Sequence, residues 1–184
     1  MPDVIVVGDG PGGLSAALFL AKNGKEVVVY GQDRTAMHAA LLHNYLGVEA
    51  VAGSDFQRIA RRQVEAQGAK VEDDHVEEII QADGAFTVKT TGGQVSFAQV
   101  LILSEGKGAR LAQSLGLSTD DDGAIPTDKN GLSEKPGVYV VGRSARPGRS
   151  QAIISAGDGA AAAIDILSRD KGEPFLDWDS PPET

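Results

Sequence analysis

The feature that most constrains the fold is a glycine-rich turn joining a short apolar run to a helical pattern. Residues 4–7 read Val-Ile-Val-Val, and such β-branched side chains favour a strand that is covered on both faces. Gly8, Gly10 and Gly13 follow at the G-x-G-x-x-G spacing, and apolar residues then recur at helical spacing over residues 14–21. The order strand, glycine turn, helix is therefore expected at the start of the chain.

Each glycine of this turn has a distinct mechanical role. The first allows the tight turn, the second lets a pyrophosphate approach the backbone, and the third lets the helix pack close to the strand. Pro11 and Gly12 stand between the last two glycines, and a second β-branched strand is expected over residues 26–30. We interpret the whole as a dinucleotide-binding βαβ unit, the alternative being a glycine-rich turn without a ligand.

Composition excludes several classes of function. The 184-residue chain is 41% hydrophobic and has no apolar stretch of membrane-spanning length, which predicts a soluble globular protein, and a cytoplasmic one because no leader sequence is visible. A net charge of −9 argues against nucleic acid and anionic membranes as partners. Such acidity fits a high-salt cytoplasm, and it fits an ordinary acidic soluble protein at least as well. There is no cysteine, and the three histidines follow no metal-ligand spacing, so no metal site is expected.

Beyond the opening unit, the pattern predicts a helix, a small antiparallel meander, two more strands of the parallel sheet and a last helix. A short helix is also expected at 37–42 and a turn of helix at 109–115. The main elements are expected at 54–67 (helix), 76–80, 86–90 and 95–97 (meander), 100–103 and 137–142 (parallel strands) and 151–168 (helix). Residues 1–170 form one expected domain, and 171–184, with three prolines, an irregular tail over the surface.

The helix beginning at Ser54 supports two further interpretations. Ser54 and Gln57 stand at the capping-box spacing, which predicts Ser54 as the N-cap. One face of the helix is apolar and the other is charged, so its arginines are interpreted as a solvated face, with a role in ligand binding as the alternative. The apolar face comprises Phe56, Ile59, Ala60 and Val64, and the charged face Arg58, Arg61, Arg62 and Glu65.

Three blocks of sequence resemble the FAD domain of the thioredoxin-reductase branch of flavin disulfide reductases. They are the glycine turn, the segment His-Asn-Tyr-Leu-Gly-Val at 43–48, similar to that branch's N-Y-P-G turn, and the pair formed by 137–142 and 151–159. The resemblance implies an α/β, Rossmann-like three-layer FAD/NAD(P)-binding fold with a parallel sheet and a small antiparallel β-meander. It also implies FAD as cofactor and, by analogy, a homodimer.

The chain also departs from that family. The inserted NADPH domain and the Cys-x-x-Cys pair are absent, so the resemblance implies a single-domain version joined between Ser104 and Leu115. The A-T-G turn of the family is here Ser-Glu-Gly at 104–106, and its final G-D is Gly142-Arg143. Gly31 takes the place of the carboxylate that many such proteins carry on the ribose, so that Gln32 or Asp33 would have to serve. Asp9, inside the glycine turn, is unfavourable beside a pyrophosphate unless it points away.

From these matches we expect a set of cofactor contacts, and three functional readings remain open. The first is a FAD-dependent oxidoreductase that exchanges electrons with a separate donor or acceptor, either a protein or NAD(P)H. The second is a nucleotide-binding or regulatory subunit that has lost turnover, and the third, weaker, is an NAD-dependent dehydrogenase. His43 is the nearest candidate acid or base, against a structural role. The expected FAD contacts are Gly8, Gly10, Pro11, Gly12, Gly13, Gln32, Asp33, Asn44, Val76, Gly106, Gly142, Arg143, Gln151 and Ala152.

Three arginines follow the last expected strand, at 143, 146 and 149. They place positive charge in an acidic protein at the expected mouth of the cofactor cleft, where guanidinium groups suit phosphate or an anionic partner. The alternative is a mobile loop that arginine keeps soluble.

Overall fold

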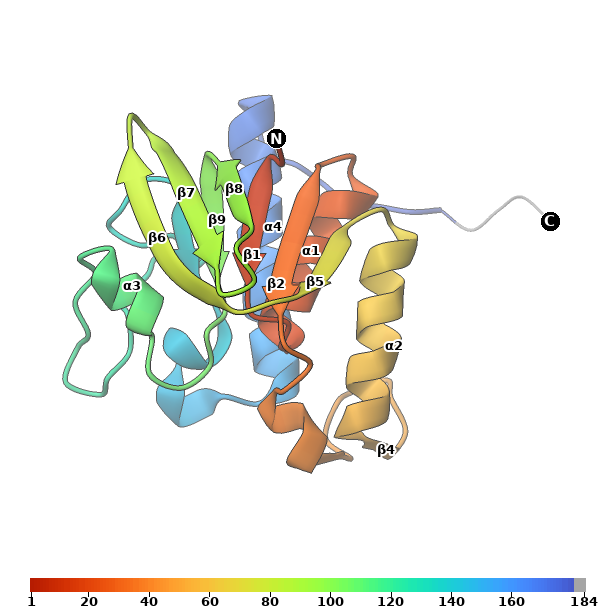
Figure 1. Ribbon diagram of the computed structural model, residues 1–184. Helices are drawn as coiled ribbons and strands as arrows, with labels where there is room; N and C mark the ends of the chain where they lie inside the picture. The colour runs from red at the N-terminus through yellow and green to blue at the C-terminus, as the bar shows by residue number, and fades with distance from the viewer. Residues whose placement is uncertain (181–184) are drawn as a thin grey trace.

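The computed structural model describes residues 1–180, and its centre is a five-stranded sheet in which every strand pair is parallel. The strand order is β10-β9-β1-β2-β5, so the first strand of the chain lies in the middle (Figure 1). The strands are β1 (Val4–Val7), β2 (Val27–Gly31), β5 (Lys70–Asp73), β9 (Val100–Leu103) and β10 (Val138–Val140). A central strand in a parallel sheet is covered on both faces, which explains its uniformly apolar sequence.

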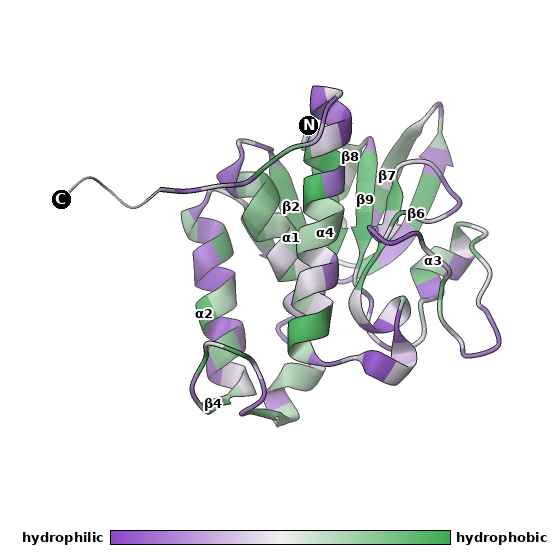
Figure 2. Ribbon diagram, turned by 180° about the vertical axis from the view of Figure 1, so that it is seen from behind, coloured by the Kyte–Doolittle hydropathy of each residue, from purple (hydrophilic) through white to green (hydrophobic). Residues whose placement is uncertain are grey.

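Three helices cover one face of this sheet. They are α1 (Pro11–Lys22), α2 (Gly53–Ala66) and α4 (Ala152–Lys171), with α1 and α4 packed side by side against the sheet (Figures 1 and 2). Successive side chains of a strand point to opposite faces, so Val4 and Val6 of β1 enter the helical core while Ile5 and Val7 enter the other one.

The opposite face is covered by a three-stranded antiparallel meander. Its strands are β6 (Val76–Ala82), β7 (Ala85–Thr90) and β8 (Val95–Ala98), and Phe86 and Val88 of β7 are fully buried against the sheet. In Figure 2 the strands of the sheet are mainly green, whereas α2 at the edge carries purple bands of polar residues. The layers are therefore helices, parallel sheet and meander, and the predicted fold class is confirmed.

Short segments connect these elements at the carboxyl edge of the sheet. From this edge the chain passes into the helices or into loops, and the same edge carries the site described below. The segments are η1 (Ala36–Ala39), β3 (Leu41–Leu42), β4 (Val51–Ala52), α3 (Arg110–Ser114), η2 (Gly142–Ser144) and η3 (Pro147–Arg149).

Two local expectations are wrong. The segment 37–42 is not one short helix: it is a 3₁₀ turn over 36–39 followed by strand β3. The capping box is also absent, because α2 begins at Gly53 with Ala52 as N-cap and no side-chain cap among the described residues. Gln57 is instead 1% exposed and donates from Nε2 to the carbonyl oxygen of Asp9. A long-range contact thus replaces the local hydrogen bond that the spacing predicts.

The segment that follows α4 is attached to the helical core through Phe175. Helix α4 continues to Lys171, three residues beyond the expected end and one beyond the expected domain boundary. Residues 172–180 form neither helix nor strand, yet Phe175 packs against the helical core and its N–H donates to the Ser168 hydroxyl at 3.0 Å. Residues 181–184 of the expected tail lie outside the described residues. Within residues 1–180 no helix is both long and apolar enough to cross a bilayer.

Candidate functional site

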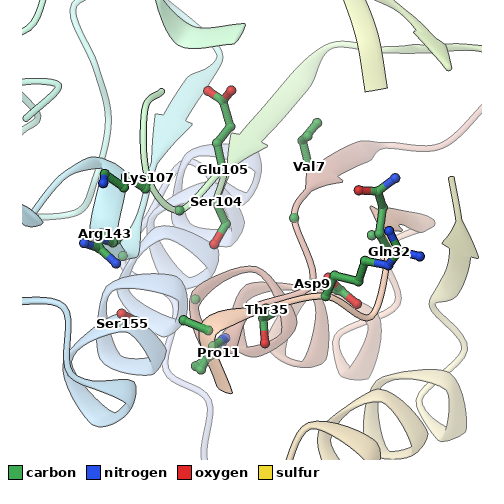
Figure 3. Close-up of a pocket in the computed structure, with 18 of the residues that line it drawn as sticks. Val7, Asp9, Pro11, Gln32, Thr35, Ser104, Glu105, Lys107, Arg143 and Ser155 are labelled. Carbon is green, nitrogen blue, oxygen red and sulfur yellow. The ribbon is translucent and has the colours of Figure 1, made fainter. Parts of the chain in front are cut away.

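A cavity of about 630 Å³ opens at the carboxyl ends of β1, β2, β9 and β10. Its walls come from the glycine turn at 8–12, the end of β2 at Gly31, the segment 104–108 after β9, and the start of α4 at Ala152. Figure 3 shows Asp9 and Gln32 at one end and Arg143 and Lys107 at the other, with Pro11 and Ser104 between them. The cavity is therefore elongated and crosses the glycine turn, at the place where open α/β sheets bind ligands.

The glycine turn is packed tightly on one side and open on the other. A side chain at Gly8 would overlap the carbonyl oxygen of Ser104, and one at Gly13 would overlap that of Gly8, each closer than 3.0 Å. Gly8 also has a φ of 102°, in the region that favours glycine. At Gly10, by contrast, a Cβ would meet no atom within 4 Å. The backbone at Gly10 is thus the part of the turn that a ligand can approach.

Two helices begin at this cavity with their N-terminal amides uncapped by side chains. The N-cap of α1 is Gly10 and that of α4 is Gln151, and within residues 1–180 no side chain caps either helix. Gly12 in the first turn of α1 and Ala152 in the first turn of α4 both line the cavity. Free amides and the helix dipole favour negative charge at such ends, so the cavity carries two anion-favouring positions.

An ion network holds the residue between the first two glycines. Asp9 is 3% exposed, and its Oδ2 accepts from Arg61 Nη1 at 2.6 Å and from the N–H of Asp33 at 3.1 Å. Arg61 also bonds Asp73 at 2.5 Å. Burial lowers the pKa of Arg61, but the hydrogen bond to Asp73 and the charges of Asp9, Asp73 and Asp33 raise it overall, so the guanidinium stays charged. The expectation that Arg61 belongs to a solvated face is therefore wrong.

The turn after β9 explains one departure from the resemblance. Glu105 accepts hydrogen bonds from the N–H groups of Leu111 at 2.7 Å and Ala112 at 3.0 Å, and so binds the start of α3. Arg110 of α3 in turn donates to the carbonyl oxygens of Val76 and Glu77, both at 3.0 Å. The glutamate at this position therefore fastens α3 and the start of the meander to the cavity wall.

The structure brings most of the expected cofactor contacts to one cavity. Their participation in binding stays a prediction. The expected residues that line it are Gly8, Gly10, Pro11, Gly12, Gln32, Val76, Gly106, Gly142, Arg143 and Ala152, and those placed elsewhere are Gly13, Asp33, Asn44 and Gln151. Gly13 packs behind the turn, and Asn44 donates to Gln151 Oε1 at 3.1 Å. His43 is exposed and lies outside the lining.

The three arginines after β10 do not act alike. Arg143 is exposed and lines the cavity beside Lys107 (Figure 3). Arg146 pairs with Asp158 of α4 at 2.9 Å, and Arg149 is exposed and lies outside the lining. Arg143 is therefore the one of the three placed to meet a ligand in the cavity.

Sequence reasoning did not identify Gln57 and Arg61 as the residues that hold Asp9 of the glycine turn in place. Gln57, Arg61 and Val64 stand at i, i+4 and i+7, which is one helix face, and this face points inward. The expected apolar face shares Val64 with it but also contains Ile59, which is 40% exposed. The i, i+4 spacing of Gln57 and Arg61 was the sequence signal for a buried polar face. It was overlooked because the apolar and charged residues of α2 were assigned to an inward and an outward face.

The parallel sheet, the glycine turn and the cavity at the carboxyl ends of the strands together define the α/β fold class of dinucleotide-binding proteins. The pyridine nucleotide-disulphide oxidoreductase family matches over residues 2–52 and 36–159. The chain therefore belongs to that family, and the predicted likeness to the thioredoxin-reductase branch is confirmed.

Individual relatives agree with this assignment. A thioredoxin reductase of Rickettsia bellii is 28% identical over 123 residues, covering 65% of this chain and 39% of the relative. A ferredoxin–NADP reductase of Lactococcus lactis subsp. cremoris is 25% identical over 166 residues, which cover 86% of this chain and 49% of the relative. A thioredoxin reductase structure from Gloeobacter violaceus has a TM-score of 0.87 at 17% identity, covering 97% of this chain and 99% of that one. The chain thus spans less than half the length of these two curated relatives.

Proposed function

We propose that this chain binds FAD and serves as the flavin-carrying part of an oxidoreductase that exchanges electrons with a separate donor or acceptor. The observation that carries the proposal is that α1 and α4 both begin, uncapped, at one elongated cavity. A dinucleotide has its anionic pyrophosphate between two ring systems, and reduced flavin gathers negative charge on one of them. Two helix N-termini that favour anions at one cavity would suit both the pyrophosphate and the reduced flavin ring.

The residues around the cavity fit this cofactor. Gly10 leaves the backbone open where the pyrophosphate would approach, and Gly12 offers a free helix-terminal amide. Lys107 and Arg143 add positive charge at the α4 end, and Gln32 borders the end of β2. The pyrophosphate would thus lie at the glycine turn, the flavin toward α4 and the adenosine toward β2.

When bound, FAD would supply the transfer of electrons, and the protein residues would bind, orient and shield it. No cysteine exists in the chain to carry out dithiol chemistry. His43, the candidate acid or base, is exposed and outside the cavity lining. The electron donor or acceptor is therefore proposed to be external, either a protein or NAD(P)H, and a homodimer stays a proposal by analogy.

A second candidate is a nucleotide-binding subunit without turnover. Glu105 favours it, because the family turn at this position has been converted into an anchor for α3. The two candidates share the bound cofactor and differ in whether that cofactor is reduced.

The test is a visible spectrum followed by a steady-state assay. Purified protein, or apoprotein titrated with FAD, is expected to show a protein-bound flavin spectrum. NADH or NADPH with an artificial electron acceptor is then expected to reduce and reoxidise it. Protein that remains colourless after FAD is added overturns the proposal. Bound flavin that neither nicotinamide nor a low-potential chemical donor reduces supports the second candidate.

A further inference from the structure

The end of β2 lacks the acidic residue that often binds a ribose, yet a carboxylate is present there. Gly31 is the last residue of β2, and a Cβ at this position would lie closer than 3.0 Å to the side chain of Asp9. The Asp9 side chain thus occupies the space where a side chain from the strand end would begin. Positions 9 and 31 therefore cannot both carry a side chain, and in this protein the side chain belongs to Asp9 in the glycine turn.

Neighbouring residues hold this carboxylate in place from several sides. Arg61 and the N–H of Asp33 both bind Oδ2, and Gln57 binds the Asp9 carbonyl oxygen. Among the hydrogen bonds of the described residues, Asp9 Oδ1 takes part in none, and Asp9 lines the cavity. One carboxylate oxygen is therefore fixed by the protein, and the other is left for a partner.

The positive charge of Arg61 reduces the repulsion that an acidic residue in this turn would otherwise exert on a pyrophosphate. Its guanidinium lies 2.6 Å from Asp9 Oδ2 and is 14% exposed at the side chain, so the pair is shielded from solvent. A charged hydrogen bond in such surroundings offsets much of the negative field at the turn. An acidic residue can thus stand between Gly8 and Gly10 without making the anion site unfavourable.

We propose that Asp9 binds the ribose hydroxyls of the adenosine half of FAD, in place of the missing acid at the end of β2. This inference depends on the proposed function, because it assigns one contact within the same cofactor site. Dinucleotide folds commonly bind the ribose with a carboxylate at the end of the second strand. In this protein a carboxylate would then reach the ribose from the glycine turn instead of from the end of β2. Gly31 would be required because it leaves the space that the Asp9 side chain occupies.

A double-mutant cycle tests this exchange by measuring FAD binding to the apoprotein through quenching of flavin fluorescence. Asp9→Gly is expected to weaken binding about ten-fold or more, as for loss of a hydrogen bond to a charged group. Gly31→Glu alone is expected to disturb the turn, because its Cβ would overlap Asp9. The double variant Asp9→Gly/Gly31→Glu is expected to bind better than either single variant, because without a Cβ at position 9 the new carboxylate enters vacated space.

A second measurement begins with the unmodified protein and keeps the inference testable if Asp9→Gly folds poorly. ADP is compared with 2′-deoxy-ADP and 3′-deoxy-ADP as competitors of FAD on the unmodified protein. At least one deoxy compound is expected to bind about ten-fold more weakly than ADP. The isosteric variant Asp9→Asn is expected to reduce that difference, with thermal unfolding as the check on folding.

The outcomes separate this inference from the proposed function. If the unmodified protein binds no FAD, the proposed function itself fails. If FAD binds normally but neither deoxy compound is disfavoured, the assignment of Asp9 is overturned while the proposed function stands. If a deoxy compound is disfavoured equally by the unmodified protein and Asp9→Asn, another residue binds the ribose and the assignment is again overturned.

Discussion

The molecule contains two strand–glycine–helix units that differ in how their connections are built. The first is β1, the turn 8–10 and α1, and the second is β10, the connection 141–151 and α4. In the first unit the backbone packs against itself, with Gly13 against the Gly8 carbonyl oxygen. In the second unit two 3₁₀ turns intervene and side chains hold the path, as in the pair between Arg146 and Asp158.

This difference shows which part of the site tolerates change. A turn made of backbone contacts has no room for variation at its close approaches, so its sequence is recognisable as a motif. A connection held by exposed side chains can change residue by residue, and Arg143 stands there in place of the aspartate of the resembled family. The two units meet where Gly159 of α4 contacts the Gly12 carbonyl oxygen of α1.

The largest expected effect is at the backbone contact within the first unit. Gly13→Ala would place a Cβ against the Gly8 carbonyl oxygen, and a turn of only three residues cannot move aside. We expect a loss of about 3 kcal/mol or more in the free energy of unfolding, measured by chemical denaturation. Gly10→Ala is the control, because no atom lies within 4 Å of its Cβ, and its stability should change little. Equal stability of the two variants would contradict the contact.

The contact between the two units is expected to be the next most sensitive. Gly159→Ala places a Cβ against the Gly12 carbonyl oxygen, but here two helices can separate slightly, so a loss of about 2 kcal/mol is expected. Gly157→Ala, two residues earlier and on the exposed side of α4, should instead gain about 0.5–1 kcal/mol of stability from helix propensity. Denaturation midpoints that move in the same direction for both variants would refute this packing.

The sequence predicts the fold well because its signals are local. The β-branched runs, the glycine spacing and the alternation in 86–90 each depend on neighbours along the chain, and β1, α1 and β7 appear where these patterns indicate. The inward face of α2 was missed because Arg61 bonds Asp9 across 52 positions, which helical periodicity does not report. The separate roles of Arg143 and Arg146 were missed for the same reason. The ion pair between Arg146 and Asp158 of α4 forms only in the folded protein and is not visible in the local sequence.

The attachment of α4 to β10 gives a prediction on pH dependence. Burial raises the pKa of Asp165, but hydrogen bonds from Tyr139, Arg169 and Asn130 lower it more, to below its ordinary value of 3.8. A lowered pKa means that ionised Asp165 stabilises the fold above that value and that this contribution is lost as the pH falls below it. Asp165→Asn should lose about 1 kcal/mol at neutral pH and flatten the acid decline in stability.

Unfolding measured from neutral to acid pH checks this expectation. The control is Asp158→Asn, whose partner Arg146 is exposed, so that a smaller loss of stability is expected from it. An acid decline as steep in Asp165→Asn as in the unmodified protein would show that another carboxylate is responsible.

The smallest expected effect concerns Arg143 in the second unit, and it tests whether that connection contributes to the cofactor site at all. Arg143 lines the cavity but is exposed, so solvent screens its attraction for a phosphate or an anionic ring. Arg143→Ala should weaken FAD binding about two- to five-fold, and the effect should shrink as salt is raised. Arg149→Ala is the matched control, since Arg149 lies outside the cavity lining, and its affinity should be unchanged. If both variants bind FAD like the unmodified protein at low salt, the positive charge of this connection has no part in the site. The first unit would then supply the electrostatic recognition together with the amide groups of α4.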